Sequence, residues 1–185
     1  MEYQDTSQQL LTWARSHFFG KYRGVVKDNQ DSANVGRLKV TVPSVLGTLE
    51  LWAMPCVPYA GDGVGFYSLP EAGTGVWIEF EAGDPSYPVW TGFFWGTGHL
   101  PDPGGAPVKI WKTQKITIRI DDDADEIVTS TSSDAKVALT DEAKTEAGGA
   151  THTVSSSGVA SEKGSGKVEV TDSAVKINNG AFEVM

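Results

Sequence analysis

The residue types that most often perform catalysis are few in this sequence and lie far apart. Its three histidines are His17, His99 and His152, and no serine-elbow, phosphate-cradling glycine, HExxH or paired-cysteine motif accompanies them. The single cysteine, Cys56, lies in an apolar stretch without a nearby histidine, and free cysteines usually pack as small hydrophobic residues. We therefore predict a buried structural thiol and no enzymatic activity.

Two features could bind a metal ion, although each has a simpler interpretation. An acidic run is similar to a calcium loop but lacks the glycine and the distal glutamate of an EF-hand, so solvated turn carboxylates are expected. In a trimer His152 would appear three times near the threefold axis and could complete a metal site, whereas a solvent-facing strand histidine is the simpler interpretation. We predict no metal and no cofactor. The acidic run comprises Asp121, Asp122, Asp123, Asp125 and Glu126.

The charge of the chain argues against a nucleic-acid partner. Its formal net charge is −9, whereas nucleic-acid binding normally depends on clustered lysine and arginine. The nearest approach to a basic cluster is the set Lys21, Arg23, Lys27, Arg37 and Lys39. These five residues fit the solvent faces of two strands better than a polyanion site.

Aromatic side chains could instead stack on bases or sugars. Most of them alternate with Ile, Val or Gly in strand patterns, which favours core packing or subunit contact because each indole must bury a large area. The residues concerned are Trp52, Trp77, Trp90, Phe93, Phe94 and Trp95.

The composition changes abruptly near Trp111. All six tryptophans, and every tyrosine and phenylalanine except Phe182, lie at or before this residue, and the last of the nine prolines is Pro107. We predict an N-terminal helical segment at residues 1–19, a barrel domain at 20–98, a linker at 99–111 and a strand-rich segment at 112–185.

The first 98 residues predict one helix followed by a small barrel. Residues 6–19 place Leu10, Leu11, Ala14 and Phe18 at near-helical spacing, so this helix would dock either on its own domain or on another subunit. Five short strands in about 80 residues, with glycines where sharply coiled strands bend, fit a five-stranded OB-fold barrel. These strands are expected at residues 21–27, 37–42, 48–57, 75–81 and 89–95. The first residues contain no basic region followed by an apolar run, so we expect synthesis in the cytoplasm without a signal peptide.

The segment after Trp111 has two interpretations. Its low hydrophobicity and abundant Ser and Gly are typical of disorder. Period-two alternation, a repeat of KVALTDEA (136–143) as KVEVTDSA (167–174) and the absence of proline instead predict a strand-rich needle built by several identical chains. The side chains expected to face the needle interior are Ile116, Ile118, Ile120, Val137, Leu139, Val168, Val170, Val175 and Ile177.

Several segments, in their order along the chain, resemble the baseplate assembly protein V group, the central spike proteins of contractile-tailed phages and related injection machines. They are FFGKYRGVV, VGRLKVTVPSV, LWAMPCVPYAG, YSLPEAGTGVWIEFEAGDPSYPVWTGFFWG and the terminal VKINNGAFEVM. The resemblance implies an all-β protein with an OB-fold domain under the tail hub and a C-terminal, trimeric, intertwined β-helical needle. It further implies a non-enzymatic structural protein of the virion tail baseplate, or of an assembled injection particle, that punctures the target cell envelope.

The sequence departs from some members of this group. Only a short linker stands where certain relatives carry a lysozyme domain, so no wall-degrading activity is expected. Thr151 and Thr153 flank His152, and the His-x-His arrangement of a metal-bearing needle tip is absent. A separate PAAR-like tip protein covering Phe182, Val184 and Met185 is then expected. The alternative is an OB-fold protein that binds nucleic acid or glycan and has a disordered tail.

Overall fold

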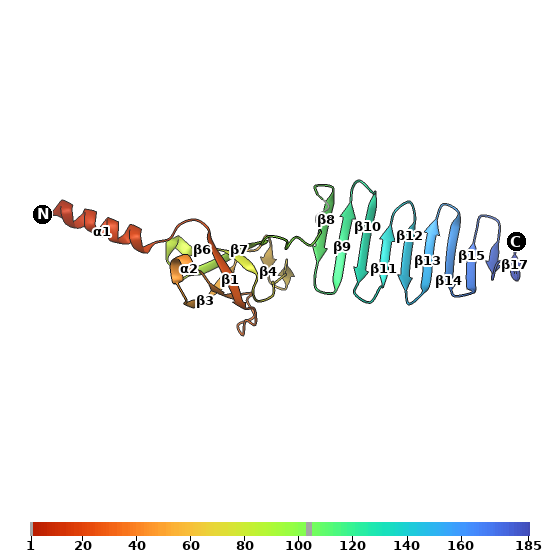
Figure 1. Cartoon of the computed structure of the whole chain (residues 1–185), viewed down its shortest axis with the longest axis horizontal. Coiled ribbons are helices and arrows are strands. Elements are labelled where there is room, and N and C mark those ends of the chain that lie inside the picture. The colour runs from red at the N-terminus through yellow and green to blue at the C-terminus, as the bar shows by residue number, and fades with distance from the viewer. Residues whose placement is uncertain (1, 103–104) are drawn as a thin grey trace. The chain divides into compact units, whose positions relative to one another are not determined.

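The computed structural model describes residues 2–102 and 105–185, which form two compact units. The first unit ends at His99 and the second begins at Leu100. Both consist mainly of β-strands (Figure 1).

The first unit is a helix followed by a closed five-stranded barrel. The strands follow one another around the barrel in the order β1-β2-β3-β7-β6, and β6 pairs with β1 to close it. Neighbouring strands are antiparallel except β3 and β7, which pair in parallel. The elements are α1 (Glu2–Ser16), β1 (Tyr22–Asp28), β2 (Leu38–Thr41), α2 (Pro43–Leu46), β3 (Glu50–Pro55), β4 (Ala60–Gly61), β5 (Val64–Gly65), β6 (Gly75–Phe80), the 3-10 helix η1 (Glu81–Gly83) and β7 (Pro88–Phe94).

Alternating side chains fill the barrel. In strand β6 the side chains of Val76, Ile78 and Phe80 are buried. Those of Trp77 and Glu79, which alternate with them, are half-buried. The Trp90 indole is 4 % exposed, and its Nε1 donates a hydrogen bond of 3.0 Å to the carbonyl oxygen of Gly36, which satisfies the only polar atom of that side chain. The core consists of Val26, Leu38, Val40, Val42, Ala53, Val76, Ile78, Phe80 and Trp90.

Strand β1 passes too close to its neighbours for a side chain at Gly24. A Cβ atom there would lie 2.8 Å from the carbonyl oxygen of Thr41 and 3.1 Å from Ile78. Glycine therefore allows this strongly coiled strand to lie against both β2 and β6. All five predicted barrel strands are present, with ends that differ by no more than two residues from the expected ones.

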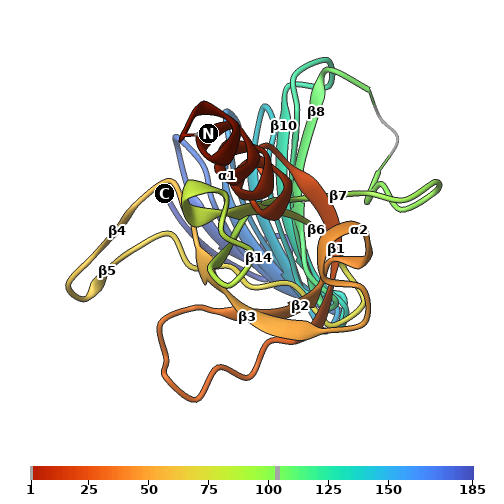
Figure 2. The same ribbon diagram turned by 90° about the vertical axis from the view of Figure 1, so that its left-hand side faces the viewer.

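Four short elements were not expected from the sequence: α2, β4, β5 and η1. Helix α2 occupies the connection between β2 and β3, and β4 and β5 form a hairpin that extends from the barrel as a separate arm (Figure 2). Helix α1 begins at Glu2 and ends at Ser16, whereas the sequence indicated residues 6–19.

The second unit is a single ten-stranded antiparallel sheet. Each strand pairs with the next along the chain, so β8 to β17 lie side by side in one layer (Figure 1). Tight turns join them, and several turn residues, including Asp125, Asp134 and Gly148, have positive φ as short hairpin turns require. The strands are β8 (Val108–Lys112), β9 (Ile116–Asp121), β10 (Glu126–Thr131), β11 (Lys136–Leu139), β12 (Ala143–Ala147), β13 (Ala150–Ser155), β14 (Gly158–Lys163), β15 (Gly166–Val170), β16 (Val175–Ile177) and β17 (Phe182–Val184). The tail therefore forms strands, as its alternating pattern predicted.

Candidate functional site

The nine side chains expected to face a needle interior lie on one face of the ten-stranded sheet. Residues directly opposite one another in an antiparallel ladder point to the same side, and the register connects Ile118 to Val137 through Thr129. The same reasoning extends from strand to strand as far as Ile177. In the single chain these nine side chains are between 36 and 48 % exposed, since the sheet has no second layer to cover them.

The register adds apolar residues to this face that the sequence analysis did not select. Trp111 lies opposite Ile118, Ile127 opposite Ile120, and the pair Val154 and Val159 continues the face across β13 and β14. Ile127 and Val154 could have been found, because each stands at an alternate position of a strand-like run. We call this side of the sheet, with the nine predicted residues, the apolar face.

The predicted tip residues continue the apolar face to its C-terminal end. Phe182 lies opposite Ile177 and Val184 opposite Val175 in the register of β16 and β17. Both side chains are more than half exposed, and Met185, which follows the strand, is 98 % exposed.

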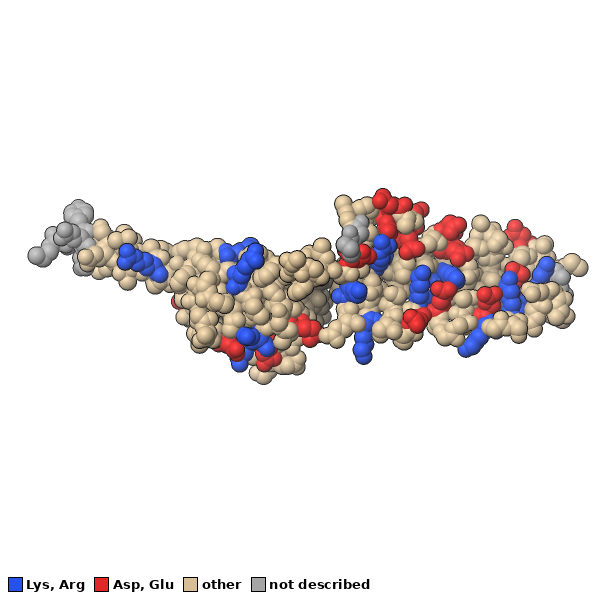
Figure 3. Space-filling view, viewed as in Figure 1, with Lys and Arg blue, Asp and Glu red and all other residues tan. Residues whose placement is uncertain are grey.

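The opposite face of the sheet carries ion pairs. Arg119 contacts Asp102 at 3.1 Å and Asp121 at 2.8 Å, and the guanidinium holds the pKa of the Asp121 carboxyl below its usual range. Lys144 likewise contacts Glu146 at 2.7 Å and lowers the pKa of that carboxyl. Charged side chains of both signs lie along this unit in Figure 3. Paired charges of this kind suit contact with water, so the two faces of the sheet differ sharply in polarity.

The acidic run forms a turn. The Asp121 carboxylate accepts hydrogen bonds from the backbone N–H groups of Asp123 and Ala124, and Asp122 pairs with Lys109. Among the residues that the structure describes, no three His, Cys, Asp or Glu side chains are grouped so that they could hold a metal ion within one chain. The Asp121 carboxylate therefore accepts its hydrogen bonds within the turn itself.

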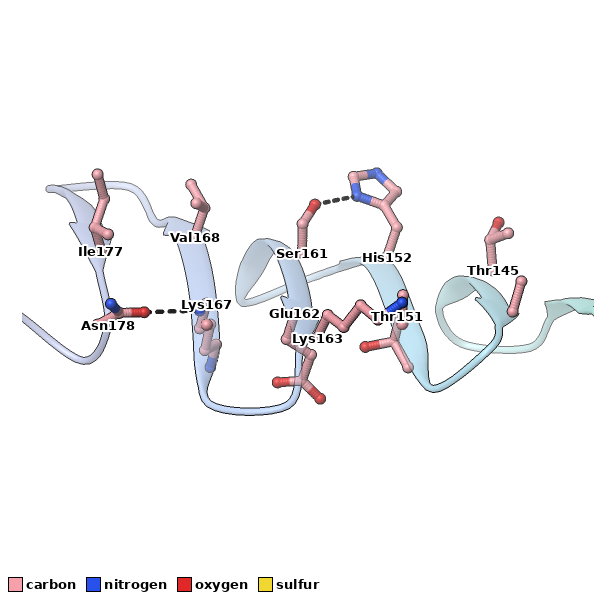
Figure 4. Close-up of a pocket in the computed structure, with 13 residues that line it drawn as sticks. Thr145, Thr151, His152, Ser161, Glu162, Lys163, Lys167, Val168, Ile177 and Asn178 are labelled. Carbon is pink, nitrogen blue, oxygen red and sulfur yellow. Dashed lines mark hydrogen bonds between the residues drawn. The ribbon is translucent and has the colours of Figure 1, made fainter.

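His152 lies on the apolar face, where its register partners are Thr145 and Ser161. Its Nδ1 lies 2.7 Å from the Ser161 hydroxyl oxygen, at hydrogen-bond distance (Figure 4). The imidazole is exposed in the single chain, and its two neighbours in the register are also polar.

The barrel aromatics are divided between the core and the outer surface. Trp90 is buried, whereas Trp52 and Trp77 are half-buried. The guanidinium of Arg37 lies 5.4 Å from the ring centre of Trp52, and that of Arg23 lies 5.3 Å from the ring centre of Trp77. Cations of the chain itself thus contact these two rings through cation–π interactions. Trp95, by contrast, is 67 % exposed.

The prediction for Cys56 is wrong in one respect: its side chain is exposed. The residue follows the last residue of β3, and its backbone N–H donates to the carbonyl oxygen of Trp90 at 2.9 Å. Inward and outward positions alternate here, with Ala53 buried and Met54 exposed, and Cys56 falls on the outward side. An apolar neighbourhood in the sequence did not reveal this orientation.

Helix α1 does not pack on its own barrel along its length. Residues 6–16 are all exposed, and Leu10, Leu11 and Trp13 are each at least 50 % exposed. The chain is anchored just after the helix, where the backbone N–H of Phe18 donates to the carbonyl oxygen of Gly83 at 2.7 Å and the Phe18 ring packs against the core. Of the two alternatives for this helix, docking on its own domain is therefore wrong.

A closed, five-stranded, mostly antiparallel barrel is the fold of an OB-like domain. Residues 22–95 match the model of the family described as the type VI secretion system/phage-baseplate injector OB domain. This match confirms the resemblance to baseplate spike proteins and indicates a structural component of a phage or type VI secretion baseplate, associated with other tail or baseplate proteins.

The family match spans the barrel and ends before the second unit. A comparison with curated proteins found no match. Within the part of the chain that the structure describes, no helix is long and apolar enough to cross a membrane.

Proposed function

We propose that this chain is the non-enzymatic central spike of a contractile baseplate, and that three copies of its second unit form a needle that punctures the target envelope. The observation that carries the proposal is the apolar face, which extends over β8 to β17 with its side chains exposed. A sheet with one uncovered apolar side is unstable in water unless another layer covers it.

Copies of the same sheet are the occupants that this face fits best. Ten strands spaced about 4.8 Å apart give an apolar strip about 43 Å long, and identical sheets can cover one another along all of it. The number three comes from the resemblance to baseplate spike proteins. A narrow rod packed with Ile, Val and Leu would supply stiffness, and contraction of the sheath would supply the force.

The two ends of the chain suit contacts with the rest of the machine. Helix α1 presents Leu10, Leu11 and Trp13 without a partner in its own barrel, and we assign this surface to the tail hub protein. At the other end the exposed side chains of Phe182, Val184 and Met185 would be covered by a PAAR-like tip protein.

The test is the solution mass of the purified chain by light scattering, combined with limited proteolysis. A mass about three times that of one 19.8 kDa chain, with a second unit that resists protease, supports the spike. A monomer that loses everything after about Trp111 contradicts it and favours the alternative, an OB-fold binding protein with an independent barrel.

A further inference from the structure

Polar side chains occupy three neighbouring strands in the middle of the apolar face. The register defines a row of residues that runs along the middle of this face, which we call the middle row. Its polar interruption is Thr145, His152 and Ser161, on three successive strands, and Val168 and Ile177 restore apolar character immediately afterwards. The middle row consists of Trp111, Ile118, Thr129, Val137, Thr145, His152, Ser161, Val168, Ile177 and Phe182.

The polar interruption coincides with a hollow of about 570 Å³ in the face. Its lining includes Thr145, Ala147, Ala150, Ser161 and Gly166, whose side chains are small. Thr145 and Ser161 belong to the middle row, where most other strands carry Trp, Ile, Val or Phe. Ala147, Ala150 and Gly166 belong to an outer row that also contains Lys163. If three sheets face one another, the small residues leave space at this level instead of a packed core.

One nitrogen of the His152 imidazole has a hydrogen-bond partner within the chain. Its Nδ1 is occupied by the Ser161 hydroxyl at 2.7 Å, and Figure 4 shows the ring on the same side of the sheet as Val168 and Ile177. No hydrogen bond joins Nε2 to any residue that the structure describes. A histidine whose Nδ1–H donates to a hydroxyl presents the Nε2 lone pair outward, and metal-binding histidines are commonly fixed by such a second contact.

We infer that the three copies of His152 in the assembled needle bind one divalent metal ion, of the kind that prefers imidazole ligands, through their Nε2 atoms. The inference rests on the proposed trimer. His152 is the central one of the three β13 residues on the apolar face, between Ala150 and Val154, so its copies would lie nearest the threefold axis. Three histidines with a water molecule in the fourth position form a familiar zinc site, and coordination satisfies nitrogen atoms that would otherwise be buried without a partner.

The charged groups of this face lie away from the central position. Lys109 lies opposite Ile120 in an outer row and pairs with Asp122. Lys163 lines the hollow but is the last residue of β14, opposite Ala150, and so belongs to an outer row. The hydroxyls of Thr145 and Ser161 are uncharged and suit an outer shell around the metal-bound water.

The experiment uses the full chain, purified without a histidine tag, treated with a chelator, and then reloaded with Zn²⁺ or Co²⁺. Light scattering gives the oligomeric mass, and mass spectrometry of the elements gives the metal content. We expect about one metal ion per three chains, a tetrahedral Co²⁺ absorption spectrum, and a rise in the melting temperature of the trimer on reloading. Valine suits an apolar strand face, so the variant His152→Val should stay trimeric. It should lose the bound metal, the tetrahedral Co²⁺ spectrum and the rise in melting temperature on reloading. The matched control His99→Gln alters a histidine of the other unit. It should keep the metal content, the Co²⁺ spectrum and the rise in melting temperature.

The outcomes separate this inference from the proposed function. A trimer that binds no metal, or whose metal content is the same in His152→Val, overturns the metal site and leaves the spike intact. A trimer that takes up chloride or phosphate at this level but no metal also overturns it. A monomer overturns both the site and the spike.

Discussion

At the scale of single residues, Asp31 organises the loop between β1 and β2. Its carboxylate accepts backbone hydrogen bonds from Ala33, Val35 and Arg37 at 3.0 to 3.2 Å, and Arg37 also contacts it through Nε and Nη2. The Asp31 side chain is only 4 % exposed. The Arg37 hydrogen bonds, together with those from the backbone, hold the pKa of this carboxyl far below its usual value. One side chain thus fixes the loop that precedes β2.

We expect Asp31→Asn to destabilise the first unit, because an amide cannot replace the charge that faces Arg37. The melting temperature at pH 7 should fall by about 5 °C. The matched control is Asp28→Asn. Among the described residues, Gln30 alone donates a backbone hydrogen bond to the Asp28 carboxylate, so this variant should change the melting temperature much less. Equal losses for the two variants would contradict the role assigned to Asp31.

The same carboxyl predicts a dependence of stability on pH. Its pKa is lowered in the folded state, whereas an aspartate in the unfolded chain has a pKa of about 3.9. Its contribution is therefore complete above about pH 4 and is lost as the pH falls from there toward the folded-state pKa. The difference in melting temperature between wild type and Asp31→Asn should shrink when the pH is lowered from 5 to about 2.5. A constant difference over this range would show that Asp31 does not act through its charge.

At the scale of elements, the stability of the barrel depends on its buried core, whereas α1 does not pack on that core. Leu38 on β2 has no exposed surface and lies among the core residues, whereas Leu49, which precedes β3, is 54 % exposed. The two leucines therefore offer a matched test of where the stability of the first unit lies.

Leu38→Ala should lower the free energy of unfolding of the barrel by about 3 kcal/mol, because it leaves a cavity in a closed core. Leu49→Ala should change it by less than about 0.5 kcal/mol. Denaturant titration followed by tryptophan fluorescence suits the measurement, since every tryptophan except Trp111 lies in the first unit. A large loss for Leu49→Ala would mean that its surface is covered in solution.

The exposed helix predicts a separation of folding from binding. The double variant Leu10→Glu, Leu11→Glu should leave the melting temperature of the chain unchanged, since neither side chain packs on the barrel. If α1 docks on the tail hub, the same variant should abolish co-purification with the hub protein. The control Gln8→Glu, Gln9→Glu alters neighbouring polar positions of the helix and should retain the hub. Retention of the hub by the leucine variant would remove α1 from that interface.

At the scale of the whole molecule, the two units differ in how far a single chain buries its apolar side chains. The barrel closes on itself and buries its own core, whereas the ten-stranded sheet presents one apolar face for which the single chain has no cover. Under the proposed function, assembly would be a condition of stability for the second unit.

If three copies form the proposed needle, the triple variant Ile118→Asp, Leu139→Asp, Val170→Asp should convert that trimer into a monomer whose second unit is cut by protease. Carboxylates buried in the apolar face would have no partners. The control Thr117→Asp, Ser130→Asp, Thr153→Asp places the same charges on the opposite face and should remain trimeric. Light scattering and limited proteolysis check both variants. A trimeric, protease-resistant apolar-face variant would show that this face is not the interface.

The sequence alone determined the features that depend on local patterns. Alternation such as that of Val76, Ile78 and Phe80 specifies a strand and its buried side, so the five barrel strands and the apolar positions of the tail could be predicted. The composition break at Trp111 likewise separated a domain with an aromatic core from a segment without one.

Only the tertiary structure decided which of these residues meet. The register of β8 to β17 placed Ile118, His152 and Ile177 in one row, which spacing along the chain cannot reveal because each turn length shifts the pairing. It also turned Cys56 outward and left α1 uncovered, although both lie in stretches that read as partly apolar. The physical reason is the same in each case: a pattern fixes the direction of a side chain relative to its own element, whereas burial depends on which other element comes to lie against it.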